Sequence, residues 1–315
     1  MDYLHDHEQF PELLRILEND KNILAGLIEK DYWIMHVLYG LKKQGLDFEL
    51  KGGTSLSKGY KIIERFSEDI DSHIKPPATQ KVEENPAKDK PSQVESRKNY
   101  YDWLAKEIKI DGIVSVQRDH AFDNKTFTSG GIRLFYKSVT SSIQGIKDGI
   151  LLEAGFDKVT PNTKITIGSW AFDKANSIGS IQIIDNRAID IACYHAGYTF
   201  VEKLQTIASR FRQEQTDGIE RPNYMRQYYD VYCLLAQLVV QDFIGTAEYT
   251  AHKAGRFPKK DLEIPVSQNE AFLLNDPELR EKFKKRYQST AALYYAGQPD
   301  FDEVMSRIKD NIHKL

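Results

Sequence analysis

The hydrophobic pattern of the chain changes near residue 186, and this change limits the possible folds more than any other feature. Before that point, short stretches of alternating apolar and polar residues lie between helical segments, which predicts a mixed sheet with flanking helices. After it, apolar residues recur every three or four positions, which predicts helices alone. We therefore expect an α+β protein with two domains, an α/β domain over residues 1–186 and an α-helical bundle over residues 187–315.

The same patterns place the individual elements. Two helices are expected within residues 13–38, and a third over residues 54–66, where a hydroxyl side chain caps its start. A fourth is expected near residues 100–108. The expected strands are 46–50, 68–74, 113–119, 132–137, 149–156 and 180–184, and the helices of the second domain are 187–213, 223–240, 276–295 and 302–314.

Residues 76–99 interrupt the first domain. They contain four prolines and almost no large apolar residue, so they cannot bury a core. We expect an exposed excursion here. A loop of this length inside a compact domain is usually either mobile or functional.

Charge and composition exclude several classes of protein. The net charge is -3, from 43 basic and 46 acidic residues, which argues against wholesale electrostatic capture of nucleic acid. Cys193 and Cys233 are too few for a disulfide framework or a cysteine-built zinc site. The N-terminal residues lack a signal-peptide pattern, and the densest apolar stretch, residues 231–240, is too short to span a bilayer. We expect a cytoplasmic protein.

Paired carboxylates occur on one of the predicted strands. Residues two apart on a strand share a face, so Asp69 and Asp71 project side by side while Ile70 points into the core. Such a pair can hold a hard divalent cation, and Mg²⁺ is the usual choice when phosphates complete its shell. The alternative is a solvated polar edge, which is the commoner meaning of an isolated Asp-x-Asp.

A glycine-rich turn precedes this strand. Gly52 and Gly53 allow a close approach of the backbone to an anion, and the following helix start offers free N–H groups. Thr54 and Ser55 add hydroxyl donors. The alternative is an ordinary tight turn from strand to helix with a capping threonine.

Further charged residues lie in unusual positions. Glu153 lies within an apolar strand, where a carboxylate is costly unless it is paired or binds a metal; otherwise that strand is exposed on one face. Lys203 flanks an apolar helix face, so it either extends to solvent or contacts something negative. Arg226 and Asp230 are four residues apart on a helix, the spacing of an ordinary surface ion pair.

Taken in chain order, five stretches resemble the AbiEii family of nucleotidyltransferase toxins, whose members share the polymerase-β-like nucleotidyltransferase core. The ordered set is far more specific than any one stretch, and it implies a nucleotidyltransferase-like sheet in the first domain. The stretches are KGGTSLSKGY, RFSEDID, GILLEAGF, TFVEKLQTIASR and MRQYYDVYCL, spread over residues 51–234.

The resemblance implies roles for the candidate residues of the first domain. Asp69 and Asp71 would bind the catalytic metal, Mg²⁺ or Mn²⁺, and Glu153 is our candidate for the third acid. Ser72, His73 and the long excursion depart from the family pattern, which leaves substrate specificity open. The residues that would seat a nucleoside triphosphate are Lys51, Gly52, Gly53, Thr54 and Ser55.

The resemblance also assigns residues of the helical domain. Lys203 matches the active-site lysine of the family and would bind the nucleotide, Asp230 matches its late aspartate, and Arg226 matches a basic position just before that aspartate. Lys203 and Arg226 would neutralise triphosphate charge. Asp230 could orient one of these two cations or contact the sugar or base of the nucleotide, and the sequence does not choose among these roles.

The implied function is metal-dependent transfer of a nucleoside monophosphate from an NTP to an RNA, such as tRNA, or to a protein. The chain would then be the toxin of a toxin-antitoxin or phage-defence pair, with a cognate antitoxin as partner. Two alternatives use the same residues: a nucleotide-binding module without turnover, and a metal-dependent phosphodiesterase or nuclease with water as the nucleophile. Basic runs at residues 252–260 and 279–287 could contact a phosphate backbone, although such runs are more often solvated helix faces.

Overall fold

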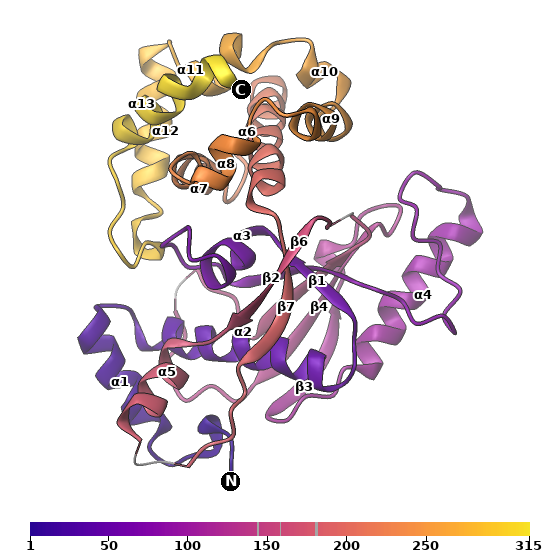
Figure 1. The fold of residues 1–315 in the computed structure, drawn as a ribbon, viewed down its shortest axis with the longest axis vertical. Coiled ribbons are helices and arrows are strands. Elements are labelled where there is room, and N and C mark those ends of the chain that lie inside the picture. Colours follow the sequence, from indigo (N-terminus) through magenta and orange to yellow (C-terminus); the bar gives the residue numbers. More distant parts are fainter. Residues whose placement is uncertain (144, 158, 180–181) are drawn as a thin grey trace. The chain divides into compact units, whose positions relative to one another are not determined.

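The structure is a computed structural model that describes residues 1–143, 145–157, 159–179 and 182–315. It forms two compact units, which we call the sheet unit and the helical unit (Figure 1). These units are defined by contacts within the chain. The domain boundary that the sequence analysis places at 186/187 therefore stays a prediction. The sheet unit comprises Met1–Tyr60 and Ser67–Tyr194, and the helical unit comprises Lys61–Phe66 and His195–Leu315.

The sheet unit is built on a mixed sheet of seven strands in the order β3-β4-β5-β2-β1-β7-β6. Strand β2 is central: it pairs antiparallel with β1 and parallel with β5. This is a mixed sheet with flanking helices, as the sequence predicts for the first part of the chain. The strands are β1 (Phe48–Lys51), β2 (Asp69–Ile74), β3 (Ile113–Asp119), β4 (Ser129–Tyr136), β5 (Ile150–Gly155), β6 (Asn162–Ile167) and β7 (Ala188–Tyr194).

Four longer helices flank the sheet. Helix α2 packs on α1 and α5 and contacts β5 and β7, whereas α4 packs on β3 and β4. The first two helices are those expected at the start of the chain. Their bounds are α1 (Phe10–Lys21), α2 (Ala25–Lys43), α4 (Pro91–Glu107) and α5 (Trp170–Ile178).

The helix predicted over residues 54–66 is wrong in its second half. Helix α3 (Gly52–Thr54) continues as a π-helical turn, Ser55–Gly59, and the chain then leaves the helical conformation. Lys61 has a φ of +55°, and residues 61–66 extend into the helical unit, where Arg65 forms a buried ion pair. Tertiary contacts therefore override local helix propensity in this segment.

The helix predicted from residue 187 is also wrong at its start, because Ala188–Tyr194 is strand β7. Asp190 has a φ of +55°, and the register with β6 shifts between Ile165 and Ile167. This bulge disturbs the alternation of a strand and spaces the buried residues Ala188 and Ile191 three apart, as in a helix.

Three further elements differ from expectation. Strand β6 and helix α5 have no counterpart in the sequence prediction. The strand predicted over residues 180–184 lies partly outside the described residues; within the described part, Ile183 forms a single bridge with Asp2.

The excursion at residues 76–99 is ordered around one arginine. Most of residues 76–92 are exposed, but the end of the segment belongs to α4, and Arg97 on that helix has no exposed surface. Its guanidinium donates to backbone carbonyl oxygens of Glu83, Asn85, Lys88 and Thr126, at 2.8 to 3.4 Å. This buried cation therefore binds the proline-rich loop at three of its carbonyl oxygens, and Ser96 and His73 add further contacts to it.

The helical unit is centred on α6, which packs against α7, α8 and α9. The apolar face of α13, containing Phe301, Val304, Met305 and Ile308, is buried, so it packs internally. No helix within the described residues is long and apolar enough to cross a membrane. The helices are α6 (Ala196–Asp217), α7 (Met225–Leu235), α8 (Leu238–Phe243), α9 (Ala247–Arg256), α10 (Lys259–Leu262), α11 (Glu270–Leu273), α12 (Pro277–Gln288) and α13 (Phe301–Asn311).

Candidate active site

The turn after β1 places the backbone directly against an acidic side chain. Gly52 has a φ of +71°, in the left-handed region that favours glycine. A Cβ atom at this position would lie 2.1 Å from Oδ2 of Asp71, which is closer than two such atoms can approach. Glycine at position 52 is therefore required for the Asp71 carboxylate to lie where it does, and the glycine turn and the acidic strand form one site.

The hydroxyls of the turn are directed inward. Thr54 and Ser55 are fully buried, and the Thr54 hydroxyl donates to the backbone oxygen of Asp69. This bond fixes the start of β2 to the turn. A phosphate at this turn would therefore meet backbone N–H groups, including that of Gly53, more readily than the two hydroxyls.

Three predicted acids share one face of the sheet. In β2, Ile70 is fully buried while Asp69 and Asp71 are partly exposed on the opposite face. The parallel register pairs Asp71 with Glu153 and Asp69 with Leu151. Residues in register on neighbouring strands share a face, so Asp69, Asp71 and Glu153 lie together.

The pKa values of these acids are raised by their surroundings. Burial, with added repulsion from Glu68 and Asp71, raises the pKa of Asp69 to about 6. Burial, with repulsion from Asp71 and Asp69, raises the pKa of Glu153 to about 7. The charges are crowded in partly desolvated positions, so any added positive charge there is stabilising.

The donor set suits a hard divalent cation. In the part of the chain that the structure describes, no group of three or more His, Cys, Asp or Glu side chains has a ready-made metal-binding geometry. Nevertheless, carboxylate oxygens are the ligands that Mg²⁺ and Mn²⁺ prefer, and the raised pKa values reflect burial and then repulsion between the acids, which such a cation would relieve. Asp69, Asp71 and Glu153 are the residues that would hold it.

Cationic side chains border the acidic face. Lys51 is in register with Asp71 on the neighbouring strand and forms a 2.6 Å ion pair with Asp157. Its charge lowers the pKa of Glu153, although burial and the other acids outweigh this effect. On β4, Arg133 is bonded to Asp119 at 2.7 Å and also lowers the pKa of Asp69.

The sequence prediction did not include Lys30, which the structure places beside the acids. Lys30 is 3% exposed and lies 3.6 Å from Glu68, and its charge lowers the pKa of Asp69. A signal was present in the sequence: Glu29, Lys30 and Asp31 are consecutive charged residues in the middle of an apolar helix. All three are buried, which such residues rarely are unless they are paired.

The flanking acids of this triplet fix the surrounding structure. Glu29 accepts hydrogen bonds from Ser138, Val139 and Thr140, at the start of the loop between β4 and β5. Asp31 pairs with Lys58 and accepts from the backbone N–H of Trp170. Helix α2 thus holds elements on both sides of the acidic strand.

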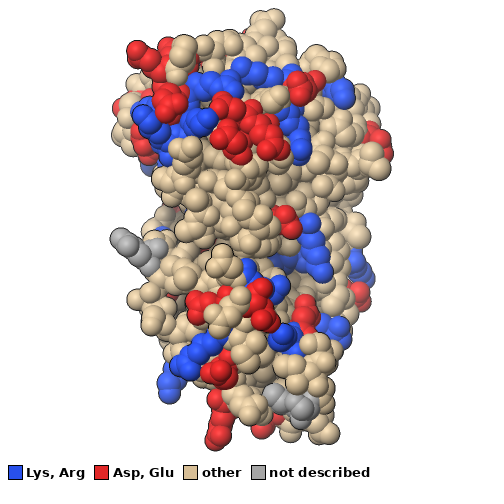
Figure 2. Space-filling view, turned by 90° about the vertical axis from the view of Figure 1, so that its left-hand side faces the viewer, with Lys and Arg blue, Asp and Glu red and all other residues tan. Residues whose placement is uncertain are grey.

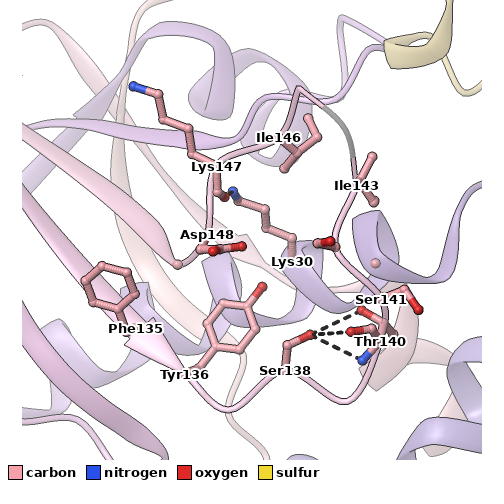
Figure 3. A pocket seen from close by; sticks show the side chains of 13 residues that line it. Lys30, Phe135, Tyr136, Ser138, Thr140, Ser141, Ile143, Ile146, Lys147 and Asp148 are labelled. Carbon is pink, nitrogen blue, oxygen red and sulfur yellow. Dashed lines mark hydrogen bonds between the residues drawn. The ribbon is translucent and has the colours of Figure 1, made fainter.

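Lys30 also lines a cavity of about 340 Å³ (Figure 3). Its wall includes Tyr136 and residues 138, 140–143 and 146–149, and the Nζ of Lys30 donates to the backbone oxygen of Lys147 at 2.5 Å. The Ser138 hydroxyl is hydrogen-bonded within the same loop. Lys30 therefore contacts both the wall of this cavity and Glu68.

The predicted residues of the helical unit form a second cluster. Asp230 on α7 has no exposed surface, and it accepts from Arg65 Nε at 2.6 Å and from Arg65 Nη2 at 2.7 Å. Nζ of Lys203, on α6, lies 2.9 Å from Asp230 Oδ2. Although burial opposes ionisation, these two cations lower the pKa of Asp230 below its ordinary value.

This geometry bears on the roles of Asp230 that the sequence left open. Asp230 is a partner of Lys203, whereas its sugar or base contact stays a hypothesis. Arg226 lies one helical turn before Asp230 on α7, with part of its surface exposed. Arg65, which the sequence prediction did not include, could not have been assigned to this cluster from its local pattern.

The basic run at residues 279–287 is neutralised by acids of the helical unit. On the surface of this unit, acidic and basic side chains lie side by side (Figure 2). This run therefore offers little unpaired charge to a nucleic acid backbone. The ion pairs are Arg280–Asp302, Lys282–Glu220, Lys284–Asp302, Lys285–Glu281 and Arg286–Glu214.

Comparison with known proteins identifies a family. The family described as "Nucleotidyl transferase AbiEii toxin, Type IV TA system" matches residues 36–307. Among solved structures, the chain is similar to an antigenic nucleotidyltransferase-like protein from Paracoccidioides brasiliensis, with a TM-score of 0.34 and 10% identity over 73% of this chain and 94% of that one. The comparison with curated proteins gives no match.

Proposed function

The chain belongs to the AbiEii nucleotidyltransferase toxin family, and we propose that it transfers a nucleoside monophosphate from an NTP to an RNA or protein acceptor, using a metal ion held by Asp69, Asp71 and Glu153. The observation that carries this proposal is the contact between the glycine turn and the acids. Gly52 leaves room for Asp71, and Asp71 is in register with Glu153. The turn and the carboxylates are thus positioned to act on one ligand.

The proposed reaction is a substitution at the α-phosphorus. A hydroxyl oxygen of the acceptor loses its proton to solvent and forms a bond to this phosphorus, the bond to the β-phosphate oxygen breaks, and pyrophosphate leaves. A divalent cation, when bound, activates the attacking oxygen and stabilises the leaving one. Backbone N–H groups at Gly52 and Gly53 bind phosphate oxygens in this proposal. Lys51, at the end of β1, adds positive charge beside them.

The helical unit supplies the remaining charge in this proposal. Lys203 is 13% exposed, so its ammonium group can contact a solvent-borne ligand while Asp230 holds it. Arg226 adds a second cation that binds the triphosphate. The basic residues at 279–287 take no part, because acids of the same unit neutralise them.

The biological setting follows from the family. We propose that the chain is the toxin of a toxin-antitoxin pair that acts in phage defence, and that a cognate antitoxin restrains it. NTPs and nucleic acid or protein acceptors are abundant in the cytoplasm, where we place the reaction.

The test is transfer of label. The pure protein and its Asp71→Ala variant are each incubated with one α-³²P-labelled NTP at a time, Mg²⁺, and total RNA or cell extract. We expect label on a macromolecule only with the intact protein, which identifies the nucleotide and the acceptor class. Label that never moves, although one NTP raises the melting temperature, would instead indicate a binding module, and cleavage of RNA without addition would indicate a nuclease.

A further inference from the structure

The cluster of Arg65, Lys203 and Asp230 carries one more positive charge than negative charge. Asp230 is fully buried and Arg65 is 4% exposed, so these two form a buried bidentate pair. Lys203, at 13%, is the member that reaches the surface. An ammonium group has three N–H donors and Asp230 accepts one, so Lys203 retains donors for a ligand.

Arg65 is held in the helical unit through its own backbone segment. Phe66 donates to the carbonyl of Leu293 at 2.7 Å, Glu64 donates to the Tyr229 hydroxyl at 3.1 Å, and the Arg65 backbone bridges to Tyr294. The segment lies between the glycine turn and strand β2 in the sequence, yet it is anchored by its own contacts to the helical unit. The guanidinium is therefore in a fixed position relative to Asp230.

We propose that Arg65 is a positioning residue for nucleotide binding. By donating to both carboxylate oxygens of Asp230, it fixes this carboxylate and neutralises its charge, which leaves the positive charge of Lys203 available to the triphosphate. This inference rests on the proposed function, because it assigns Lys203 to the triphosphate. Without Arg65, Asp230 and Lys203 form a neutral pair, and the ammonium is committed to Asp230 in a partly buried site. With Arg65 present, the cluster has a net charge of +1 and attracts an anion.

The charge count gives an experimental design that does not depend on catalysis. The probe is inorganic triphosphate with Mg²⁺, and the readout is its dissociation constant by calorimetry. Arg65→Met makes the cluster neutral and should weaken binding about tenfold or more, the effect of about 1.4 kcal/mol. Arg65→Lys keeps the charge but loses the bidentate hydrogen bonds to Asp230, so it should weaken triphosphate binding less than Arg65→Met does.

A double variant distinguishes an effect of the cluster's net charge from an effect of impaired folding. Arg65→Met combined with Asp230→Asn restores the net charge of +1 and removes the carboxylate that would hold the Lys203 ammonium, so triphosphate binding should recover from the Arg65→Met value. Transfer of label should stay slow, because Lys203 is no longer held in place. A lower kcat with a recovered dissociation constant is the signature of positioning.

The matched control is Arg286→Met. Arg286 makes a bidentate pair with Glu214, at 2.7 and 2.9 Å, in the same unit but away from Lys203. It should lower the melting temperature, as Arg65→Met does, without changing triphosphate affinity. Equal triphosphate affinity in the wild type, Arg65→Met and Arg286→Met would overturn the role of Arg65, whereas absence of triphosphate binding in the wild type would overturn the proposed function as well.

Discussion

At the scale of residues, the sheet unit brings several carboxylates close together around Asp71. Asp71 occupies space that any side chain at position 52 would fill, and its charge raises the pKa values of both Asp69 and Glu153. A chain optimised for stability alone would not crowd these acids. A cation bound at the proposed metal site would relieve the repulsion between these acids.

Gly52→Ala tests the close approach at the turn. The new Cβ would displace the Asp71 carboxylate, so transfer of label should fall by about a hundredfold or more, as for the loss of a catalytic group. Gly45→Ala is the control, since Gly45 has a φ of +83° but open space around it. Both variants should lose about 1 kcal/mol of stability from backbone strain, measured by denaturant unfolding. Wild-type transfer by Gly52→Ala would show that the contact with Asp71 is dispensable.

The raised pKa values predict how stability depends on pH in the absence of metal. Folded-state pKa values of about 6 for Asp69 and about 7 for Glu153 lie above those of the unfolded chain, so the folded protein binds these protons more tightly. Their stabilising contribution is complete below pH about 4. It is lost as the pH rises through about 7.

Asp71→Asn isolates this effect. Because Asp71 raises both pKa values, the variant in EDTA at pH 8 should be more stable than the wild type, by on the order of 1 kcal/mol. The difference should disappear below pH about 4, where the acids are protonated. Melting temperatures measured across this range, with and without Mg²⁺, provide the check. Parallel curves for the two proteins would contradict the proposed crowding.

At the scale of elements, alternation of polar and apolar residues was the reliable guide. It placed β2 and β5 and put Asp69 and Asp71 on one face of their strand, whereas only the register between β2 and β5 adds Glu153 to that face. It failed for β7, where the bulge at Asp190 mimics helical spacing. It also failed for residues 61–66, whose conformation depends on Asp230, far along the chain.

The same contrast holds for the charged residues. Lys30 could have been found, because three charged residues in an apolar helix require buried partners. Arg65 could not, because its local sequence gives no sign of a partner 165 residues away. Long-range ion pairs of this kind form only in the folded protein and produce no periodic pattern in the sequence.

Arg97→Met tests whether the excursion is ordered by one side chain. Its loss leaves the carbonyl oxygens that it binds without a donor, at a cost of about 1–3 kcal/mol for each that stays buried. Residues 81–90 should then exchange amide hydrogens roughly tenfold faster or more. Lys106→Met, at an exposed position of the same helix, is the control. Unchanged exchange in Arg97→Met would mean that other contacts hold the loop.

At the scale of the molecule, the chain passes between its two units at residues 60/61, 66/67 and 194/195. A fragment that ended at residue 186 would separate Arg65 from Asp230 and leave its guanidinium without this partner. The two charge clusters therefore depend on a continuous chain, although each belongs to a single unit. One cluster carries crowded carboxylates, and the other carries excess positive charge.

The most direct test of the central claim is binding of Mn²⁺, followed by electron paramagnetic resonance, because it requires neither the nucleotide nor the acceptor. The wild type and Asp47→Asn, a change at an exposed acid of the same unit, should bind Mn²⁺ equally and release it to Mg²⁺. Asp71→Asn should bind it about tenfold more weakly or worse, since one carboxylate ligand is lost. Equal Mn²⁺ binding by all three proteins would contradict the assignment of the metal site to Asp69, Asp71 and Glu153.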